Sequence, residues 1–105
     1  MIKDILRATG LYFWPNRTAT PPDETYALYF DDVTADGADG INLLFTHDCM
    51  VELYEPEPDD TAEASIETQL NARGLKWTKQ TRYWLDSVKR YQTIYEFSYI
   101  DKRRA

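Results

Sequence analysis

Residues 41–55 read INLLFTHDCMVELYE, and their alternation gives the clearest structural signal in the chain. The odd-numbered positions form an almost continuous apolar row: Ile41, Leu43, Phe45, His47, Cys49, Val51 and Leu53. Because successive side chains of a β-strand point to opposite faces, this row predicts one long strand with a single face in the core. Prolines at positions 56 and 58 end the strand.

The same stretch holds three residue types that often carry catalysis or bind metals: His47, Asp48 and Cys49, including the only histidine and the only cysteine. A zinc site needs three or four ligands, and no second histidine or cysteine exists to complete one. A Cys–His dyad is also disfavoured, because same-face neighbours on a strand project in parallel about 6–7 Å apart. We interpret His47 and Cys49 as core positions and predict no catalytic residue, metal or cofactor.

Residues 25–32, TYALYFDD, predict a partner strand with Tyr26, Leu28 and Phe30 on one face. The segment that follows, VTADGADG, contains two Asp-Gly steps, which favour a long hairpin with a solvated acidic tip. A calcium-loop alignment starting at Asp32 fails at its twelfth position, where Leu43 replaces the required glutamate. Weak divalent binding by the clustered carboxylates stays open as an alternative.

Helical patterns lie on either side of this predicted hairpin. Residues 2–9 have helical apolar spacing and end at Gly10, whereas residues 12–24, YFWPNRTATPPDE, read as loop. A second helix begins at Asp60 as N-cap, with Glu63 in capping-box position, and ends at Gly74. Its narrow apolar stripe consists of Ala62, Ile66 and Leu70.

The last third of the chain alternates again. Residues 75–85, LKWTKQTRYWL, and 91–100, YQTIYEFSYI, predict two strands joined across DSVKR, followed by a polar tail, DKRRA. The element order is therefore α-β-β-α-β-β. It predicts one α+β domain over residues 1–105, with a roughly four-stranded antiparallel sheet and two helices on one face.

The net charge of −6 conceals a strong asymmetry along the chain. Residues 1–72 hold 3 cations and 15 acids, so 3 − 15 = −12, and residues 73–105 hold 9 cations and 3 acids, so 9 − 3 = +6. Either the fold keeps complementary acidic and basic faces that suit contact between copies, or it intermixes the two halves. No apolar run approaches the roughly 20 residues of a membrane span. The N-terminus does not read as a signal peptide, and one cysteine suits a reducing compartment, so cytosolic synthesis is expected.

Aromatic and basic residues interleave in the C-terminal third. The aromatic members are Trp77, Tyr83, Trp84, Tyr91, Tyr95, Phe97 and Tyr99, and the basic ones are Lys79, Arg82, Lys89 and Arg90. Such a surface could stack single-stranded nucleic acid or a peptide. The acidity of the remaining chain favours a different interpretation, in which these aromatics form core and subunit interface.

Three stretches carry a family resemblance: MIKDILRATGL, YALYFDDVTADGADGINLLFTHDCMVELYEP and IETQLNARGLKWTKQTRYWLDSVKRYQTIYEFSYI. They resemble the small tail-terminator or head–tail completion proteins of long-tailed phages and prophages of Gram-positive bacteria. The resemblance implies a structural virion protein made in the host cytoplasm, without enzymatic activity or cofactor. Such proteins form a homo-oligomeric ring, usually a hexamer, which caps the tail tube and joins it to the head connector.

The resemblance also implies the partners, which are other copies, the tail tube protein and the head connector proteins, with DNA passing through the ring without specific binding. No motif of the family assigns individual residues to contacts with a partner. We therefore combine the resemblance with the charge asymmetry of the chain. The expected interface residues are Asp31, Asp32, Asp36, Asp39, Lys89, Arg90, Tyr91, Tyr95, Lys102, Arg103 and Arg104. Two alternatives remain: another connector layer, such as a stopper or adaptor, or a small binding module that uses the aromatic-basic hairpin.

Overall fold

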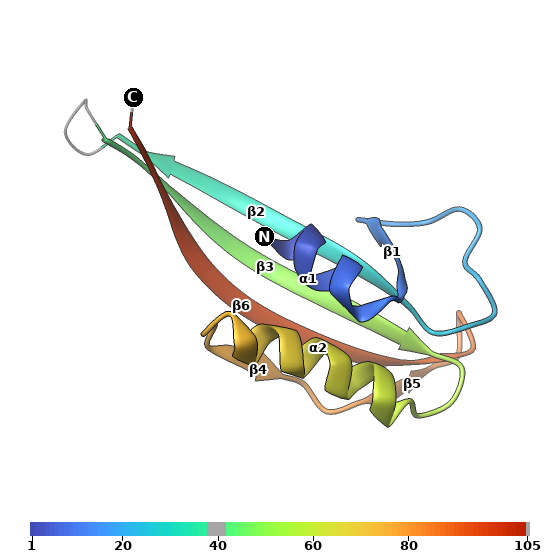
Figure 1. Ribbon diagram of the computed structural model, residues 1–105. Coiled ribbons are helices and arrows are strands. Elements are labelled where there is room, and N and C mark those ends of the chain that lie inside the picture. The colour runs from blue at the N-terminus through green and yellow to red at the C-terminus, as the bar shows by residue number, and fades with distance from the viewer. Residues whose placement is uncertain (38–41, 105) are drawn as a thin grey trace.

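The computed structural model describes residues 1–37 and 42–104 and shows an α+β fold (Figure 1). Its elements in chain order are α1 (Ile2–Thr9), β1 (Tyr12–Pro15), β2 (Tyr26–Asp36), β3 (Asn42–Glu55), α2 (Asp60–Ala72), β4 (Trp77–Lys79), β5 (Tyr83–Leu85) and β6 (Arg90–Arg104). The strands form one six-stranded sheet in the order β1-β2-β3-β6-β4, with β5 also paired to β6. The sheet is mostly antiparallel, as predicted, but it has six strands rather than four.

The predicted long strand is β3, and it lies at the centre of the sheet. β2 pairs antiparallel with one edge of β3, with Tyr26 opposite Tyr54 and Asp36 opposite Leu44. β6 pairs antiparallel with its other edge along its whole length. The hairpin predicted from residues 25–55 is therefore confirmed, and β2 and β6 run in the same direction on either side of β3.

Both helices pack on the face of the sheet that carries the odd-numbered residues of β2, β3 and β6. The core there joins strand residues to apolar positions of both helices: Ile2, Ile5, Leu6, Ala27, Tyr29, Cys49, Val51, Leu53, Ala62, Ile66, Leu70, Tyr95 and Phe97. The helical stripes predicted from sequence supply all six helix members of this set. α1 ends where Gly10 adopts a left-handed backbone with φ of 77°, which glycine accommodates without strain.

The three long strands continue well beyond the helices (Figure 1). We call this extension the arm, and it consists of residues 31–36 of β2, 42–49 of β3 and 98–104 of β6. The arm makes the molecule elongated, with extents of 49 × 28 × 22 Å. Apolar side chains remain in contact with water there, since Val33 is 47% and Ile100 67% exposed.

Two predictions about the edges of the sheet are wrong. Residues 12–15 were expected in a loop but form β1, which pairs parallel with β2. Pro15 is compatible with this position because an edge strand needs no backbone donor on its outer side. The segment expected as one strand over residues 75–85 forms two short strands, β4 and β5, each paired with a different part of β6.

The predicted polar tail is also a strand, because β6 continues to Arg104 and pairs with β3 as far as Asn42. The backbone hydrogen bonds between β6 and β3 do not depend on the polarity of the side chains. The apolar periodicity of the sequence therefore did not predict that the strand continues here. Ala105 lies outside the described residues.

Helix α2 begins one residue earlier than its sequence pattern predicts. Asp59, not Asp60, is the N-cap, and its carboxylate accepts a hydrogen bond from the backbone N–H of Ala62 at 3.0 Å. A second oxygen of Asp59 accepts from the hydroxyl of Thr25 at 2.6 Å, which ties the helix start to β2. Glu63 makes no capping box, because its side chain is buried among other polar groups.

We expect Asp59→Ala to lower the free energy of unfolding by about 1–2 kcal/mol, because it leaves the first turn of α2 without its cap. Asp60→Ala is the matched control, since the Asp60 side chain is 94% exposed and should matter by less than about 0.5 kcal/mol. Urea denaturation followed by circular dichroism measures both. Equal losses in the two variants would contradict the assignment of the cap.

Candidate functional site

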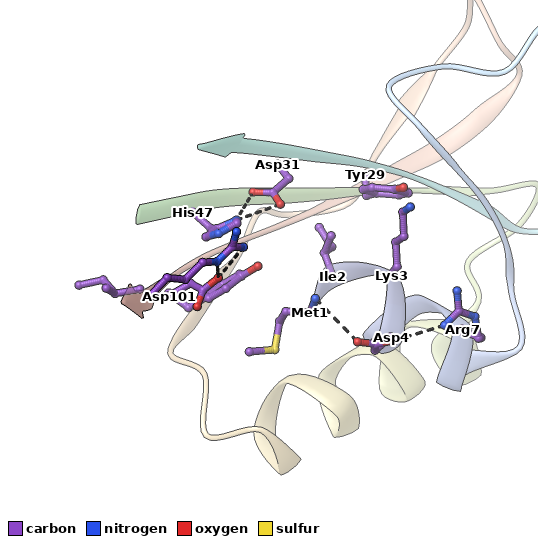
Figure 2. A pocket seen from close by; sticks show the side chains of 12 residues that line it. Met1, Ile2, Lys3, Asp4, Arg7, Tyr29, Asp31, His47 and Asp101 are labelled. Atoms are coloured by element: carbon purple, nitrogen blue, oxygen red, sulfur yellow. Dashed lines mark hydrogen bonds and ion pairs between the residues drawn. The ribbon is translucent and has the colours of Figure 1, made fainter. Parts of the chain in front are cut away.

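His47 and Cys49 converge on a carboxylate that the sequence does not place beside them. β2 brings Asp31 opposite Cys49, and the Nδ1–H of His47 donates to the two Asp31 oxygens at 2.8 and 3.0 Å (Figure 2). The Cys49 thiol donates to the same carboxylate at 3.6 Å. Asp48 lies on the opposite face, where it accepts a hydrogen bond from Ser98. Sequence reasoning separated Asp48 from the pair correctly but missed Asp31.

This arrangement does not activate the thiol. Because Asp31 accepts from both side chains, His47 and Cys49 share a partner instead of bonding to each other as a nucleophilic dyad requires. Burial, with the neighbouring Asp31 charge, raises the pKa of Cys49 to about 12, so the thiol stays protonated at neutral pH. The His47 ring stacks on Tyr99 with centroids 4.3 Å apart. These contacts support the interpretation of His47 and Cys49 as structural core residues.

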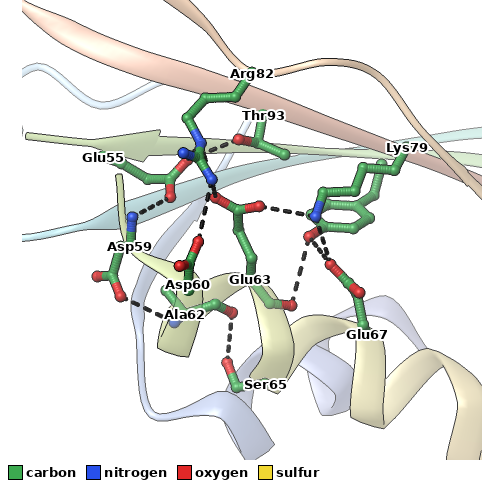
Figure 3. Close-up of polar contacts among 11 residues, drawn as sticks. Glu55, Asp59, Asp60, Ala62, Glu63, Ser65, Glu67, Lys79, Arg82 and Thr93 are labelled. Atoms are coloured by element: carbon green, nitrogen blue, oxygen red, sulfur yellow. Dashed lines mark hydrogen bonds and ion pairs between the residues drawn. The ribbon is translucent and has the colours of Figure 1, made fainter. Parts of the chain in front are cut away.

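A second polar cluster lies under α2 (Figure 3). We call it the carboxylate cluster, and it consists of Glu55, Glu63, Glu67, Lys79, Arg82, Thr93 and Tyr95. Glu63 pairs with Lys79 at 2.8 Å and with Arg82 at 2.9 Å. Glu55, which is fully buried, accepts from the Thr93 hydroxyl at 2.7 Å. The cluster thus connects β3, α2, β4 and β6.

Two carboxyl groups meet inside the carboxylate cluster. Burial, together with a hydrogen bond to Glu63, raises the pKa of Glu55 to about 7. Burial acts to raise the pKa of Glu63 as well, but hydrogen bonds from Glu55 and Lys79 lower it below its ordinary value. Of the two glutamates, Glu55 is therefore the one that is protonated more readily.

The sequence analysis did not identify this pair of carboxyl groups. The available signal was position 55, which continues the buried odd-numbered row of β3 with a glutamate. Glu55 is fully buried and the Glu63 side chain is 4% exposed, so both carboxyl groups make their contacts inside the protein. The cluster therefore acts to hold α2 against the sheet.

Three of the four aspartates predicted as interface residues lie in a strand. Asp31, Asp32 and Asp36 belong to β2, and Asp39 lies outside the described residues. The described part of the rejected calcium-loop alignment, Asp32 to Asp36, is extended strand, and the alignment also spans residues outside the described ones. In residues 1–37 and 42–104, no three His, Cys, Asp or Glu side chains are grouped to hold a metal ion.

The predicted contacts of the C-terminal third are divided between core and surface. Tyr95 is fully buried, so it is a core residue and its prediction as a surface contact is wrong. Lys89 pairs with Asp86 at 2.6 Å, and Arg90 donates to the Pro22 carbonyl. Tyr91 is half-buried against Trp84. The basic residues nearest the aromatics thus already contact groups of their own chain.

Lys102 and Arg103 are exposed on the arm. Arg103 pairs with Asp101 at 2.8 Å and lies over the Phe45 ring, and its side chain stays 60% exposed. Arg104 is described only as the last backbone position of β6. The acidic residues of the first part of the chain therefore pair with the basic residues of the last part at the carboxylate cluster. On the arm, the acidic and basic residues remain separated.

The arm keeps acids on one outer strand and cations on the other. Residues 30–36 of β2 read FDDVTAD, with three acids and no cation, and residues 98–104 of β6 read SYIDKRR, with three cations and one acid. These strands lie on opposite sides of β3. Each outer strand therefore presents its own sign of charge.

The sheet face without helices is also acidic. Its carboxylates come from even-numbered positions of β2, β3 and β6: Asp32, Asp48, Glu52 and Glu96. Asp32 and Asp48 are direct partners across β2 and β3, which places two like charges side by side. This face therefore repels anions and disfavours binding of a phosphate backbone.

Comparison with protein-family models and with curated proteins finds no match for this chain. Among the described residues, no helix is both long and apolar enough to cross a membrane.

Proposed function

We propose that this protein is a structural component of a phage virion, a tail terminator that assembles as a ring on the head-proximal end of the tail tube. The ring, a hexamer in this proposal, ends tube growth and presents a surface to the head connector. The proposal combines the family resemblance of the sequence with one structural observation, which is the arm.

The arm supports an assembly role because, beyond the core residues His47 and Cys49 at its base, neither helix covers it. Helices cover the sheet at Tyr29 and Val51, whereas Val33 and Ile100, on opposite faces of the arm, are about half or more exposed. Three strands that expose apolar side chains on both faces are stabilised when another protein covers them. Contact with neighbouring copies or with the tube supplies such cover.

The acidic, helix-free face fits the lining of a channel for DNA. If this face points inward and α1 and α2 point outward, Asp48 and Glu96 face the passing duplex. Carboxylates at the channel wall repel phosphates, so the DNA moves through without binding. The same acidity, together with the internal ion pairs of Lys79 and Arg82, argues against the alternative of a nucleic-acid binding module.

The test uses purified tail tubes from the phage or prophage that encodes the chain. We expect gold-labelled protein to appear in negative-stain images at one end of each tube, and tubes grown in its presence to have a fixed length. Labelling along the tube wall or no labelling would contradict the proposal. A ring bound to purified heads but not to tubes would favour a stopper or adaptor layer instead.

A further inference from the structure

The two outer strands of the arm have unpaired edges. β1 pairs with β2 only as far as Tyr29, and β4 pairs with β6 only over residues 95–97. Among the residues that the structure describes, no strand pairs with the outer edge of β2 over 30–36 or of β6 over 98–104. Neither segment contains proline, so each residue keeps its backbone N–H. Such edges are templates for strand addition.

The charges of the two edges select among the possible pairings. Joining two β2 edges brings Asp32 and Asp36 of one copy against the same acids of another. Joining two β6 edges brings Lys102 and Arg103 together in the same way. Like charges opposite each other destabilise a strand pair, whereas a β2 edge against a β6 edge joins opposite charges. The surviving contact is heterologous, and a contact of this class forms a ring when the rotation between copies closes, or an open filament when it does not.

We propose that copies of this protein associate by pairing the β2 edge of one arm with the β6 edge of the next, so that their sheets become continuous. The partner is a second copy of the chain, and this inference rests on the proposed ring function. β2 and β6 run in the same direction, since both are antiparallel to β3. Copies related by rotation about an axis along the strands therefore meet as parallel strands.

Charge reversal tests this contact. One variant carries Asp32→Lys and Asp36→Lys, and a second carries Lys102→Glu and Arg103→Glu. We expect each variant alone to lose every species above monomer mass in native mass spectrometry at concentrations where the wild type associates. The fold should survive, because Asp32 faces Asp48 and the Arg103–Asp101 pair is exposed to water, where ion pairs add little stability. Circular dichroism and thermal melting provide this control.

The equimolar mixture of the two variants gives the sharper result. In the mixture, the cationic β2 edge of the first variant meets the anionic β6 edge of the second, and the remaining two edges also match. We expect association to return, with the two variants alternating, so that any closed ring contains an even number of copies. Association of either variant alone, or none in the mixture, would overturn the proposal.

Cysteine cross-linking identifies the edges directly. Thr34→Cys is placed on the β2 edge and Ile100→Cys on the β6 edge, in separate chains. Under oxidation, the mixture should give the heterodimer, whereas twofold pairing would give homodimers from each chain alone. If the wild type caps tubes but no β2–β6 cross-link forms, this interface is wrong and the terminator role stands. If the edges cross-link but tubes stay uncapped, the terminator role is wrong and the interface stands.

Discussion

Replacing Tyr95 with alanine should lower the free energy of unfolding by about 3–5 kcal/mol, as large aromatic truncations in protein cores do. The Tyr95 ring is fully buried in the core and packs against Trp77 with centroids 5.8 Å apart. Its hydroxyl donates to Glu67 at 2.6 Å, so the substitution also removes a hydrogen bond from the carboxylate cluster. Domains are commonly stable by about 5–15 kcal/mol, so this loss is a large share of the total.

Two variants separate the packing of Tyr95 from its polar contact. Tyr95→Phe keeps the ring and should cost about 1 kcal/mol, the net value of one hydrogen bond. Tyr83→Ala removes the same side chain from a surface position, where Tyr83 is 48% exposed, and should cost less than about 1 kcal/mol. Chemical denaturation of the three variants measures these differences. A Tyr95→Ala loss no larger than that of Tyr83→Ala would show that Tyr95 is not a core residue.

The stability of the protein should fall as the pH rises through neutrality, because of Glu55. The pKa of Glu55 is raised from 4.5 to about 7 by burial and by its hydrogen bond to Glu63. The folded chain therefore holds a proton between these pH values that the unfolded chain has released. Stability from this group is complete below pH 4.5 and is lost as the pH rises through about 7, by about 3 kcal/mol in total.

Glu63 and Glu67 affect the pH dependence of stability in the opposite direction to Glu55. Burial acts to raise the pKa of Glu67, but hydrogen bonds from Lys79 and Tyr95 lower it, and the pKa of Glu63 is lowered too. The stability that Glu63 and Glu67 add to the folded protein is complete above their ordinary pKa of 4.5. It is lost in stronger acid, as the pH falls through their lowered pKa values. The carboxylate cluster therefore stabilises the fold most in mildly acidic solution.

Glu55→Gln isolates the contribution of Glu55. The amide does not titrate, so the variant stays uncharged at this position at every pH, as the protonated acid is. Between pH 5 and pH 8, we expect the stability of the variant relative to wild type to improve by about 2–3 kcal/mol. Urea denaturation at both pH values measures it. A difference that is independent of pH would contradict the assignment of the raised pKa to Glu55.

Much of the fold could be predicted because apolar periodicity reports burial directly. The alternating row of residues 41–55 and the helical stripes at Ile5 and Ile66 predicted β3, α1 and α2, and each is found. The same alternation assigned His47 and Cys49 to the core. The failures lie where backbone pairing decides the structure. β1 has only four residues and ends in a proline, β4 and β5 both pair with β6, and the end of β6 is polar.

Apolar periodicity therefore predicts which segments have a buried face, because that information is carried by each side chain and its neighbours along the chain. Which distant charges meet depends on how the sheet is assembled. Asp31 joins His47 across 16 positions, and Glu63 joins Arg82 across 19. Tyr95 lies in the core because α2 covers its face of the sheet. The arm keeps acids on one edge and cations on the other because β3 lies between β2 and β6. These outcomes depend on strand order and register, which are properties of the folded sheet and not of any local segment.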